Sequence, residues 1–128
     1  MAIDDPRDEE VLQCNEVLKA LAHPLRRAIL AKLKDPELHF SEQQHPLSLG
    51  VCAGLIEQGC PLAQSSASAH LAALQAAGLL RARKIGTNVF YQRNEEAIQA
   101  FLTRINAELT AKPARMADPE RNNDVETV

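Results

Sequence analysis

The side chains best suited to chemistry lie between Gln58 and Asn94, a stretch of 37 residues that contains no Asp or Glu. Its first half contains four small polar side chains: Gln64, Ser65, Ser66 and Ser68. Amides and hydroxyls of this size can hydrogen-bond to base edges and to phosphate oxygens. Because they fall at the start of one helical pattern, we expect them to form a surface that contacts nucleic acid.

The second half of this stretch supplies positive charge. Its four cations surround a turn of Gly86, Thr87 and Asn88: Arg81, Arg83, Lys84 and Arg93. The window carries +4, although the whole chain has a formal net charge of -3, and phosphates respond to the local charge. Five acids against one Arg in residues 1–10 account for most of the difference. The same pattern also fits an ordinary solvated surface, so charge alone leaves both readings open.

Three cysteines are the other reactive groups: Cys14, Cys52 and Cys60. An odd number at scattered positions does not form a disulfide framework, so we expect reduced thiols and a cytoplasmic protein. They could sense oxidants or soft metals, or they could be small buried hydrophobic residues. His39 and His45 lie in a polar stretch, where solvation is the simpler expectation.

Composition predicts the architecture that positions these groups. A chain of 128 residues with 45% hydrophobic and 3% aromatic residues has room for one core, built mainly from helices. We expect an acidic arm over 1–10, a folded domain over 11–110 and a polar, disordered tail over 111–128. No apolar run reaches the ~20 residues of a membrane span, and the acidic start lacks the features of a signal peptide.

Hydrophobic periodicity predicts two helices before the functional stretch. The first runs from Val11 to Ala22, and the second begins at Pro24 and stops before Asp35. Residues 36–46 are polar and show no period, so we expect a loop. Residues 47–49 alternate and predict a short edge strand, after which Gly50 opens a third helix.

The remaining pattern contains the nucleic-acid surface itself. A helix over 64–77 buries Ala67, Leu71 and Leu74 and ends at Gly78. Strands over 79–85 and 89–93 form a hairpin, and a last helix over 95–109 has a wide apolar stripe. The predicted fold is mainly α with a small β-hairpin, in the order α-α-(short β)-α-α-β-β-α, a winged helix-turn-helix.

Two segments carry a closer resemblance. LKALAHPLRRAIL, residues 18–30, resembles the LKALADPTRLRIL opening of the ArsR/SmtB family of bacterial repressors. AQSSASAHLAALQAAGLL, residues 63–80, resembles the SQSTVSHHLKVLREAGLV recognition segment of that family. The likeness covers roughly residues 11–109, and two independent motifs occur in the right order.

The resemblance implies a homodimer formed by the first and last helices. Two recognition helices would enter successive major grooves of an imperfect palindrome, with half-sites about 34 Å apart, and an inducer would release the DNA. Family DNA contacts map onto Gln64, Ser65, Ser66, Ser68, Ala69, Lys84, Thr87 and Arg93. The chain departs from the family at Ala69, Ala72 and Gln75, where family members carry His, Lys and Arg. Binding should therefore rest more on the wing and on DNA shape.

The family's metal sites fit this sequence poorly. The site on the last helix needs histidines, and none follows His70. The family's Cys-Val-Cys string reads Gly50, Val51, Cys52 here, which keeps one thiol. Cys14 of the partner subunit could join Cys52 in a disulfide switch, or with Cys60 hold a thiophilic metal ion as inducer. No cofactor is required.

Two other functions are consistent with parts of the sequence. An alanine-rich helix face could dock on protein, which would make the chain a dimeric interaction module without DNA binding. The acid-free hairpin favours DNA over this alternative. A thiol enzyme using Cys60 with His70 has little support, because no orienting acid or substrate pocket accompanies the pair.

Overall fold

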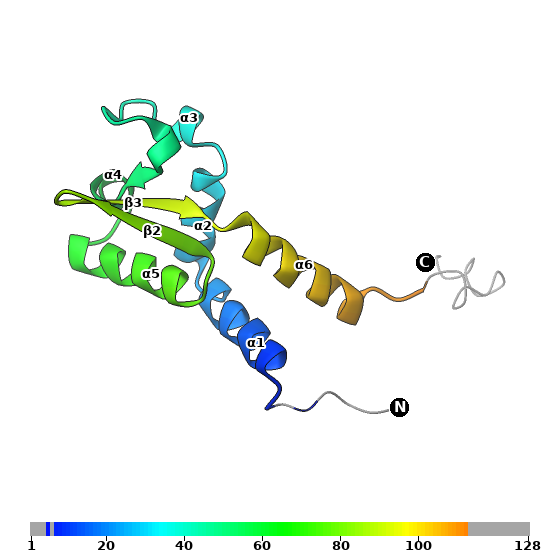
Figure 1. Ribbon diagram of the computed structural model, residues 1–128. Coiled ribbons are helices and arrows are strands. Elements are labelled where there is room, and N and C mark those ends of the chain that lie inside the picture. The colour runs from blue at the N-terminus through cyan, green and yellow to red at the C-terminus, as the bar shows by residue number, and fades with distance from the viewer. Residues whose placement is uncertain (1–4, 6, 113–128) are drawn as a thin grey trace, which may run out of the picture.

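The computed structural model, which describes Asp5 and residues 7–112, has the predicted succession of helices followed by a hairpin and a last helix (Figure 1). The elements are α1 (Glu9–Leu21), α2 (Pro24–Leu33), α3 (Pro36–His39), the 3-10 helix η1 (Leu47–Leu49), β1 (Val51–Cys52), α4 (Ala53–Gln58), α5 (Gln64–Ala76), β2 (Leu80–Ile85), β3 (Asn88–Arg93) and α6 (Glu95–Leu109). The winged helix-turn-helix is confirmed. Residues 1–4 and 6 of the predicted acidic arm, and the tail beyond Lys112, lie outside the described residues.

The first two helices begin where local chemistry favours it. The Asp8 carboxylate accepts a hydrogen bond from the backbone N–H of Glu10 at 2.8 Å and so caps α1. Helix α1 therefore starts at Glu9, inside the segment predicted as an arm. Pro24 occupies the first turn of α2, where its missing N–H costs nothing.

The three strands form an antiparallel sheet in the order β1-β3-β2. Placing the short strand at residues 47–49 was wrong: these residues form η1, and β1 follows at Val51, which faces Tyr91 of β3. The reason lies at Gly50, whose φ of 106° redirects the chain toward β3. A Cβ at Gly50 would lie 2.9 Å from the Tyr91 carbonyl oxygen, so only glycine lets the backbones approach this closely.

Residues 36–46 are more ordered than the predicted loop. They begin with the single-turn helix α3, and Phe40 is buried against the core. The Gln43 side chain then fixes the chain: its Nε2 donates to the Gly50 carbonyl at 3.0 Å, and its Oε1 accepts from the Cys52 N–H at 2.8 Å. The Gln43 side-chain amide thus makes hydrogen bonds that backbone pairing would otherwise make. Because the segment is polar and has no periodicity, its sequence did not predict this order.

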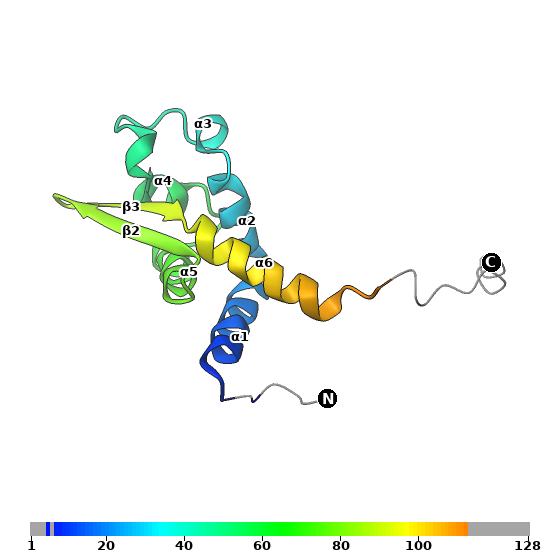
Figure 2. The ribbon, with the colours of Figure 1, turned by 45° about the vertical axis from the view of Figure 1, so that its right-hand side comes forward.

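The core lies where α5, the sheet and α2 meet. Its largest fully buried side chains are Val51, Leu71, Leu74, Leu79 and Phe90. The hairpin β2–β3 projects from one side of the molecule, and α6 extends toward the other (Figures 1 and 2). Among the described residues no helix combines the length and apolar character needed to cross a membrane.

Candidate nucleic-acid interface

Helix α5 presents one face to the core and the opposite face to solvent. Ala67, Leu71 and Leu74 are at most 1% exposed, which confirms the predicted buried stripe. Gly78 ends the helix with a φ of 83°, as predicted for a left-handed cap. The Gln13 amide of α1 also donates to the carbonyl of Ala77 at 3.1 Å. The orientation of α5 is therefore fixed from both the core and its C-terminal end.

The outward face of α5 carries the predicted contact residues. All five are exposed: Gln64, Ser65, Ser66, Ser68 and Ala69. No side chain caps the N-terminus of α5, and its first turn contains no acid. Together these features give a surface of small side chains that a major groove could receive. Contact with DNA at these residues stays a prediction.

Helix α4 and α5 form the helix-turn-helix pair. Gly59 closes α4, and residues 60–63 turn the chain into α5. Ile56 of α4 is 4% exposed and belongs to the core cluster that contains Leu71 and Leu74. Packing of α4 against the inner face of α5 leaves the outer face uncovered within the part of the chain that the structure describes.

The hairpin places its polar residues as the turn chemistry requires. Gly86 has a φ of 63°, and Lys84 and Thr87 are exposed beside it. Arg83 is also exposed. Arg81 lies 3.5 Å from Glu96 of α6, but both side chains are more than half exposed, so this ion pair is weak. The wing therefore presents its cations at and near the turn.

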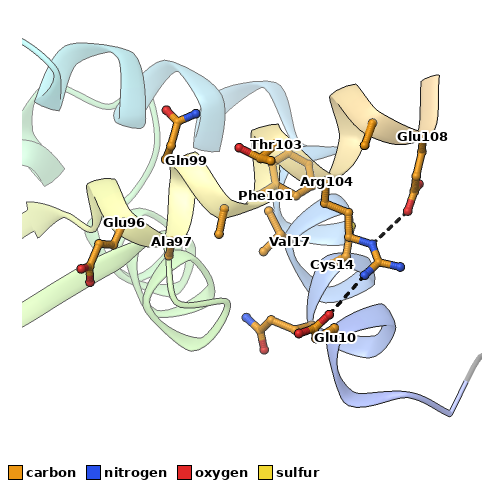
Figure 3. Close-up of a pocket in the computed structure, with 13 residues that line it drawn as sticks. Glu10, Cys14, Val17, Glu96, Ala97, Gln99, Phe101, Thr103, Arg104 and Glu108 are labelled. Carbon is orange, nitrogen blue, oxygen red and sulfur yellow. Dashed lines mark hydrogen bonds and ion pairs between the residues drawn. The ribbon is translucent and has the colours of Figure 1, made fainter. Parts of the chain in front are cut away.

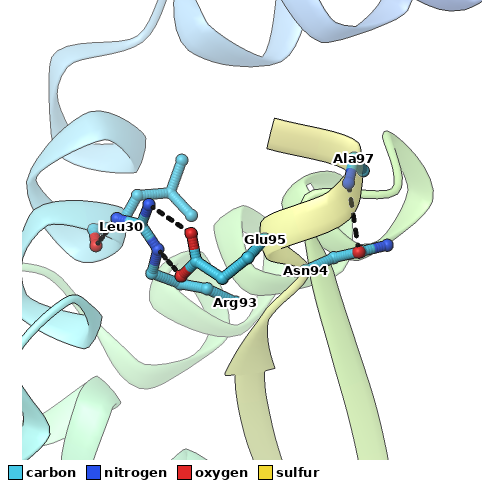
Figure 4. Close-up of polar contacts among 5 residues, drawn as sticks. All are labelled: Leu30, Arg93, Asn94, Glu95 and Ala97. Carbon is cyan, nitrogen blue, oxygen red and sulfur yellow. Dashed lines mark hydrogen bonds and ion pairs between the residues drawn. The ribbon is translucent and has the colours of Figure 1, made fainter. Parts of the chain in front are cut away.

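Arg93 does not fit the predicted phosphate contact. Its side chain is only 14% exposed, and its guanidinium bonds to Glu95 at 2.7 Å and to the Leu30 carbonyl at 3.0 Å (Figure 4). That carbonyl belongs to the last turn of α2, where helices leave acceptors without an internal partner. The neighbouring Asn94 accepts from the Ala97 N–H at 3.2 Å and caps α6. Arg93 thus joins α2 to the start of α6.

The three thiols are dispersed. Cys14 lies on α1, Cys52 at the end of β1 rather than inside the third helix, and Cys60 after α4; all are half-buried. The Cys60 Sγ donates to the Ile56 carbonyl at 3.3 Å, and burial, followed by the charge of Glu57, raises its pKa. Such a thiol is a poor nucleophile, against the thiol-enzyme alternative. Within the described chain no group of three or more His, Cys, Asp or Glu could hold a metal.

A groove of about 910 Å³ runs between α1 and α6 (Figure 3). Cys14, Val17 and Phe101 contribute to its lining. Arg104 crosses it, 2.9 Å from Glu108 of its own helix and 3.6 Å from Glu10 of α1. Several large apolar side chains of the two helices are exposed: Leu12, Leu18, Leu102 and Leu109. These are the helices for which a partner was predicted.

His70 lies against α2. Its Nδ1 accepts a hydrogen bond from Arg26 Nε at 3.1 Å, and its ring centroid lies 4.3 Å from that of His23. The sequence interpretation did not connect these three residues. The cations of residues 17–34, another stretch without Asp or Glu, are a sequence signal that could have pointed to this cluster.

Comparison with known proteins supports the same fold. YbzH of Bacillus subtilis (strain 168), an uncharacterised helix-turn-helix-type transcriptional regulator, is 38% identical over 96 residues, which are 73% of this chain and 96% of that protein. No family model matches the chain.

Solved structures give the same result. The domain 1–100 of Mb0332 from Mycobacterium bovis, described as a homodimeric winged helix-turn-helix DNA-binding domain and a possible ArsR-family regulator, is 28% identical with a TM-score of 0.57. The match covers 84% of this chain and 91% of that domain. An ArsR-like transcriptional regulator from Rhodococcus sp. RHA1 shares the fold at 24% identity, with a TM-score of 0.58 over 79% of this chain and 86% of that one.

Proposed function

Because the chain belongs to the ArsR family of winged helix-turn-helix transcriptional regulators, which are not enzymes, we propose that it is a homodimeric, sequence-specific DNA-binding repressor. It would bind an imperfect palindrome and leave it when an inducer is present. One observation carries the proposal: the outer face of α5 combines exposed small polar side chains with the absence of acids, beside a hairpin on which Arg83 and Lys84 face solvent. A helix face that only met water would normally carry Lys and Glu.

DNA binding can be tested with a pair of charge-matched variants. Ser66→Glu places a carboxylate on the reading face, where it would meet phosphates and weaken binding to fragments of the protein's own promoter at least about tenfold. Ser41→Glu adds the same charge at an exposed position in the 36–46 segment and should leave binding unchanged. A glutamate in the first turn favours a helix, so unfolding would not explain the loss at Ser66.

Fluorescence anisotropy at several salt concentrations gives the readout. Wild type should bind promoter DNA more tightly than a scrambled duplex, with an affinity that falls as salt rises. Binding that is absent across a broad set of promoter fragments would contradict the proposal and favour the interaction-module alternative.

We propose that the dimer forms through α1 and α6. The exposed leucines and the open groove between these helices support this arrangement, and Mb0332 is described as homodimeric. Leu102 is 50% exposed on α6, whereas Leu38, on α3 outside the groove, is 69% exposed. Leu102→Glu should therefore shift sedimentation toward monomer, and Leu38→Glu should not. Equal behaviour of the two variants would exclude α6 from the interface.

For the inducer, we propose thiol chemistry at Cys14 and Cys52. Cys14 lines the α1–α6 groove, and Cys52 is the N-cap residue of α4, the helix that precedes α5, so modification of either could alter how α5 is presented. A thiophilic metal would need ligands from two subunits, since one protomer gathers too few within its described residues. Titrating the DNA complex with an oxidant, a persulfide donor and arsenite tests these routes. Unchanged release in both Cys14→Ser and Cys52→Ser would discard the thiol sensor.

A further inference from the structure

A second concentration of positive charge lies on α2 and the residues next to it. Residues 17–34 contain no Asp or Glu and hold five cations: Lys19, Arg26, Arg27, Lys32 and Lys34. The first turn of α2 accordingly has no acidic residue. Arg26 lies in this turn and reaches across to α5, while Arg27 turns back to the carbonyl of Leu21. Of the two neighbouring arginines, Arg26 is the one whose side chain points to α5.

Arg26 meets two imidazoles. Its Nε donates to His70 Nδ1 at 3.1 Å, and the rings of His23 and His70 lie 4.3 Å apart at an interplanar angle of 53°. A neutral histidine that accepts at Nδ1 carries its proton on Nε2. His70 therefore keeps an N–H donor on the side away from Arg26. The guanidinium also keeps its two terminal nitrogens, which have no acidic partner within the described residues.

The position of His70 on α5 brings this group to the edge of the reading face. His70 follows Ser66 by four residues, and side chains at that spacing are neighbours on a helix surface. Ser66 is exposed and His70 is half-buried, so the helix surface passes from solvent to core between them. The cluster of His23, Arg26 and His70 thus borders the exposed face on its Ser66 side. A helix that enters a major groove has phosphates along both flanks.

The charge of the cluster suits an anion. Burial, then the charges of His23 and Arg26, lower the pKa of His70, so the ring is neutral and a hydrogen-bond donor at neutral pH. The family segment LKALADPTRLRIL has Asp where this chain has His23, which would place a carboxylate beside the pair. Here an imidazole replaces it, and the guanidinium lacks that internal counter-charge.

We propose that His23, Arg26 and His70 form a phosphate-binding site that holds the DNA backbone on the flank of α5. This inference rests on the proposed DNA binding and adds a contact outside the recognition helix and the wing. The site supplies cationic donors that α5 itself lacks, because residues 64–76 contain no Lys or Arg. It would contribute affinity and orientation but no sequence discrimination.

The salt dependence of DNA binding provides the test. Each phosphate contact adds about 0.9 to the slope of log K against log salt on duplex DNA. Because the proposed homodimer carries two copies of the site, Arg26→Gln, which can still donate to His70, should make the slope less negative by about 1.8 and weaken binding by about 25- to 100-fold at 100 mM salt. The loss should be the same factor on the promoter fragment and on a random duplex, as expected for a contact that reads no bases.

A matched control removes the same charge at Lys34, the C-cap of α2. Lys34→Gln lies eight residues farther along, about 12 Å from Arg26 at the helical rise of 1.5 Å per residue, and should leave the slope unchanged. His23→Asp, at an exposed position, should weaken binding more than Arg26→Gln because its carboxylate both neutralises the guanidinium and repels phosphate. His23→Asp also provides a second test of the site if the Arg26→Gln protein does not fold.

The outcomes separate this inference from the proposed function. Wild type that binds its promoter, with wild-type slopes in Arg26→Gln and His23→Asp, would overturn the phosphate site and leave the repressor standing. Equal losses of DNA affinity in Arg26→Gln and Lys34→Gln would mean that the overall net charge, and not a specific contact, causes the loss, and would also overturn the site. Absence of DNA binding by wild type would remove both.

Discussion

Replacing Arg93 by methionine should separate a structural arginine from a DNA-contacting one. The guanidinium ties the last turn of α2 to Glu95 at the start of α6, as Figure 4 shows. Methionine keeps the apolar stem but provides no donor. The change should destabilise the fold and leave the salt dependence of DNA binding as it is in wild type.

The magnitude follows from the two lost interactions. Leaving the partly buried Leu30 carbonyl without its partner costs about 1–3 kcal/mol. The pair with Glu95 adds little, about 0.2–1 kcal/mol, because the Glu95 side chain is 68% exposed. A total of about 2 kcal/mol corresponds to a fall in Tm of about 8–16 °C for a domain of this size.

Thermal unfolding followed by circular dichroism, together with anisotropy at several salt concentrations, measures both quantities. Lys84→Gln is the control: Lys84 is exposed at the wing of each protomer, so its loss from the proposed homodimer should make the salt slope less negative by about 1.8 and change the Tm hardly at all. An Arg93→Met protein with wild-type Tm and a slope reduced like that of Lys84→Gln would refute the structural assignment and restore the phosphate contact.

Two further predictions concern stability. Gly50→Ala should lower the free energy of unfolding by about 1–3 kcal/mol, because φ is 106° and the new Cβ would meet the Tyr91 carbonyl. Gly54→Ala inside α4 is the control: its Cβ meets nothing within 4 Å, so the change should be neutral or stabilising. Similar urea midpoints for the two variants would contradict this prediction. Because burial, His23 and Arg26 lower the pKa of His70 below 6.5, the unfolded chain binds more protons at this group, so its contribution to stability is full above pH 6.5 and is lost as the pH falls. Unfolding midpoints at pH 7.5 and 5.5 should differ less in His70→Gln than in wild type, and an unchanged difference would disprove the linkage.

Much of the helical architecture was predictable because its signals are local. The buried stripe of α5 repeats within one helix, and Gly78 ends it. The wing was predicted for the same reason, since Gly86 marks the turn between two alternating runs. Such patterns depend only on residues a few positions apart, so no knowledge of the tertiary fold is needed to read them.

The errors fell where distant segments meet. The short strand was placed at residues 47–49 instead of at β1, because its position depends on how Gly50 approaches Tyr91, 41 positions away in the chain. Residues 36–46 lacked periodicity, yet Phe40 and Gln43 fasten them to the core and to β1. Arg93 looked like a wing cation by sequence position, but its partner Leu30 lies 63 residues earlier.

The sequence by itself determined the family, the order of the elements and the small polar face of α5. Periodicity, turn residues and motifs involve residues that are close together in the chain, so they can be recognised without the fold. Only the tertiary structure decided which cations remain available for phosphate. Docking of β3 against α2 gives the Arg93 guanidinium a carbonyl and a carboxylate within the protein. Docking of α2 against α5 brings Arg26 to His70, 44 residues away, and leaves its terminal nitrogens without an acidic partner in the described part of the chain. A charge is defined by its residue type, but its partner is defined by packing.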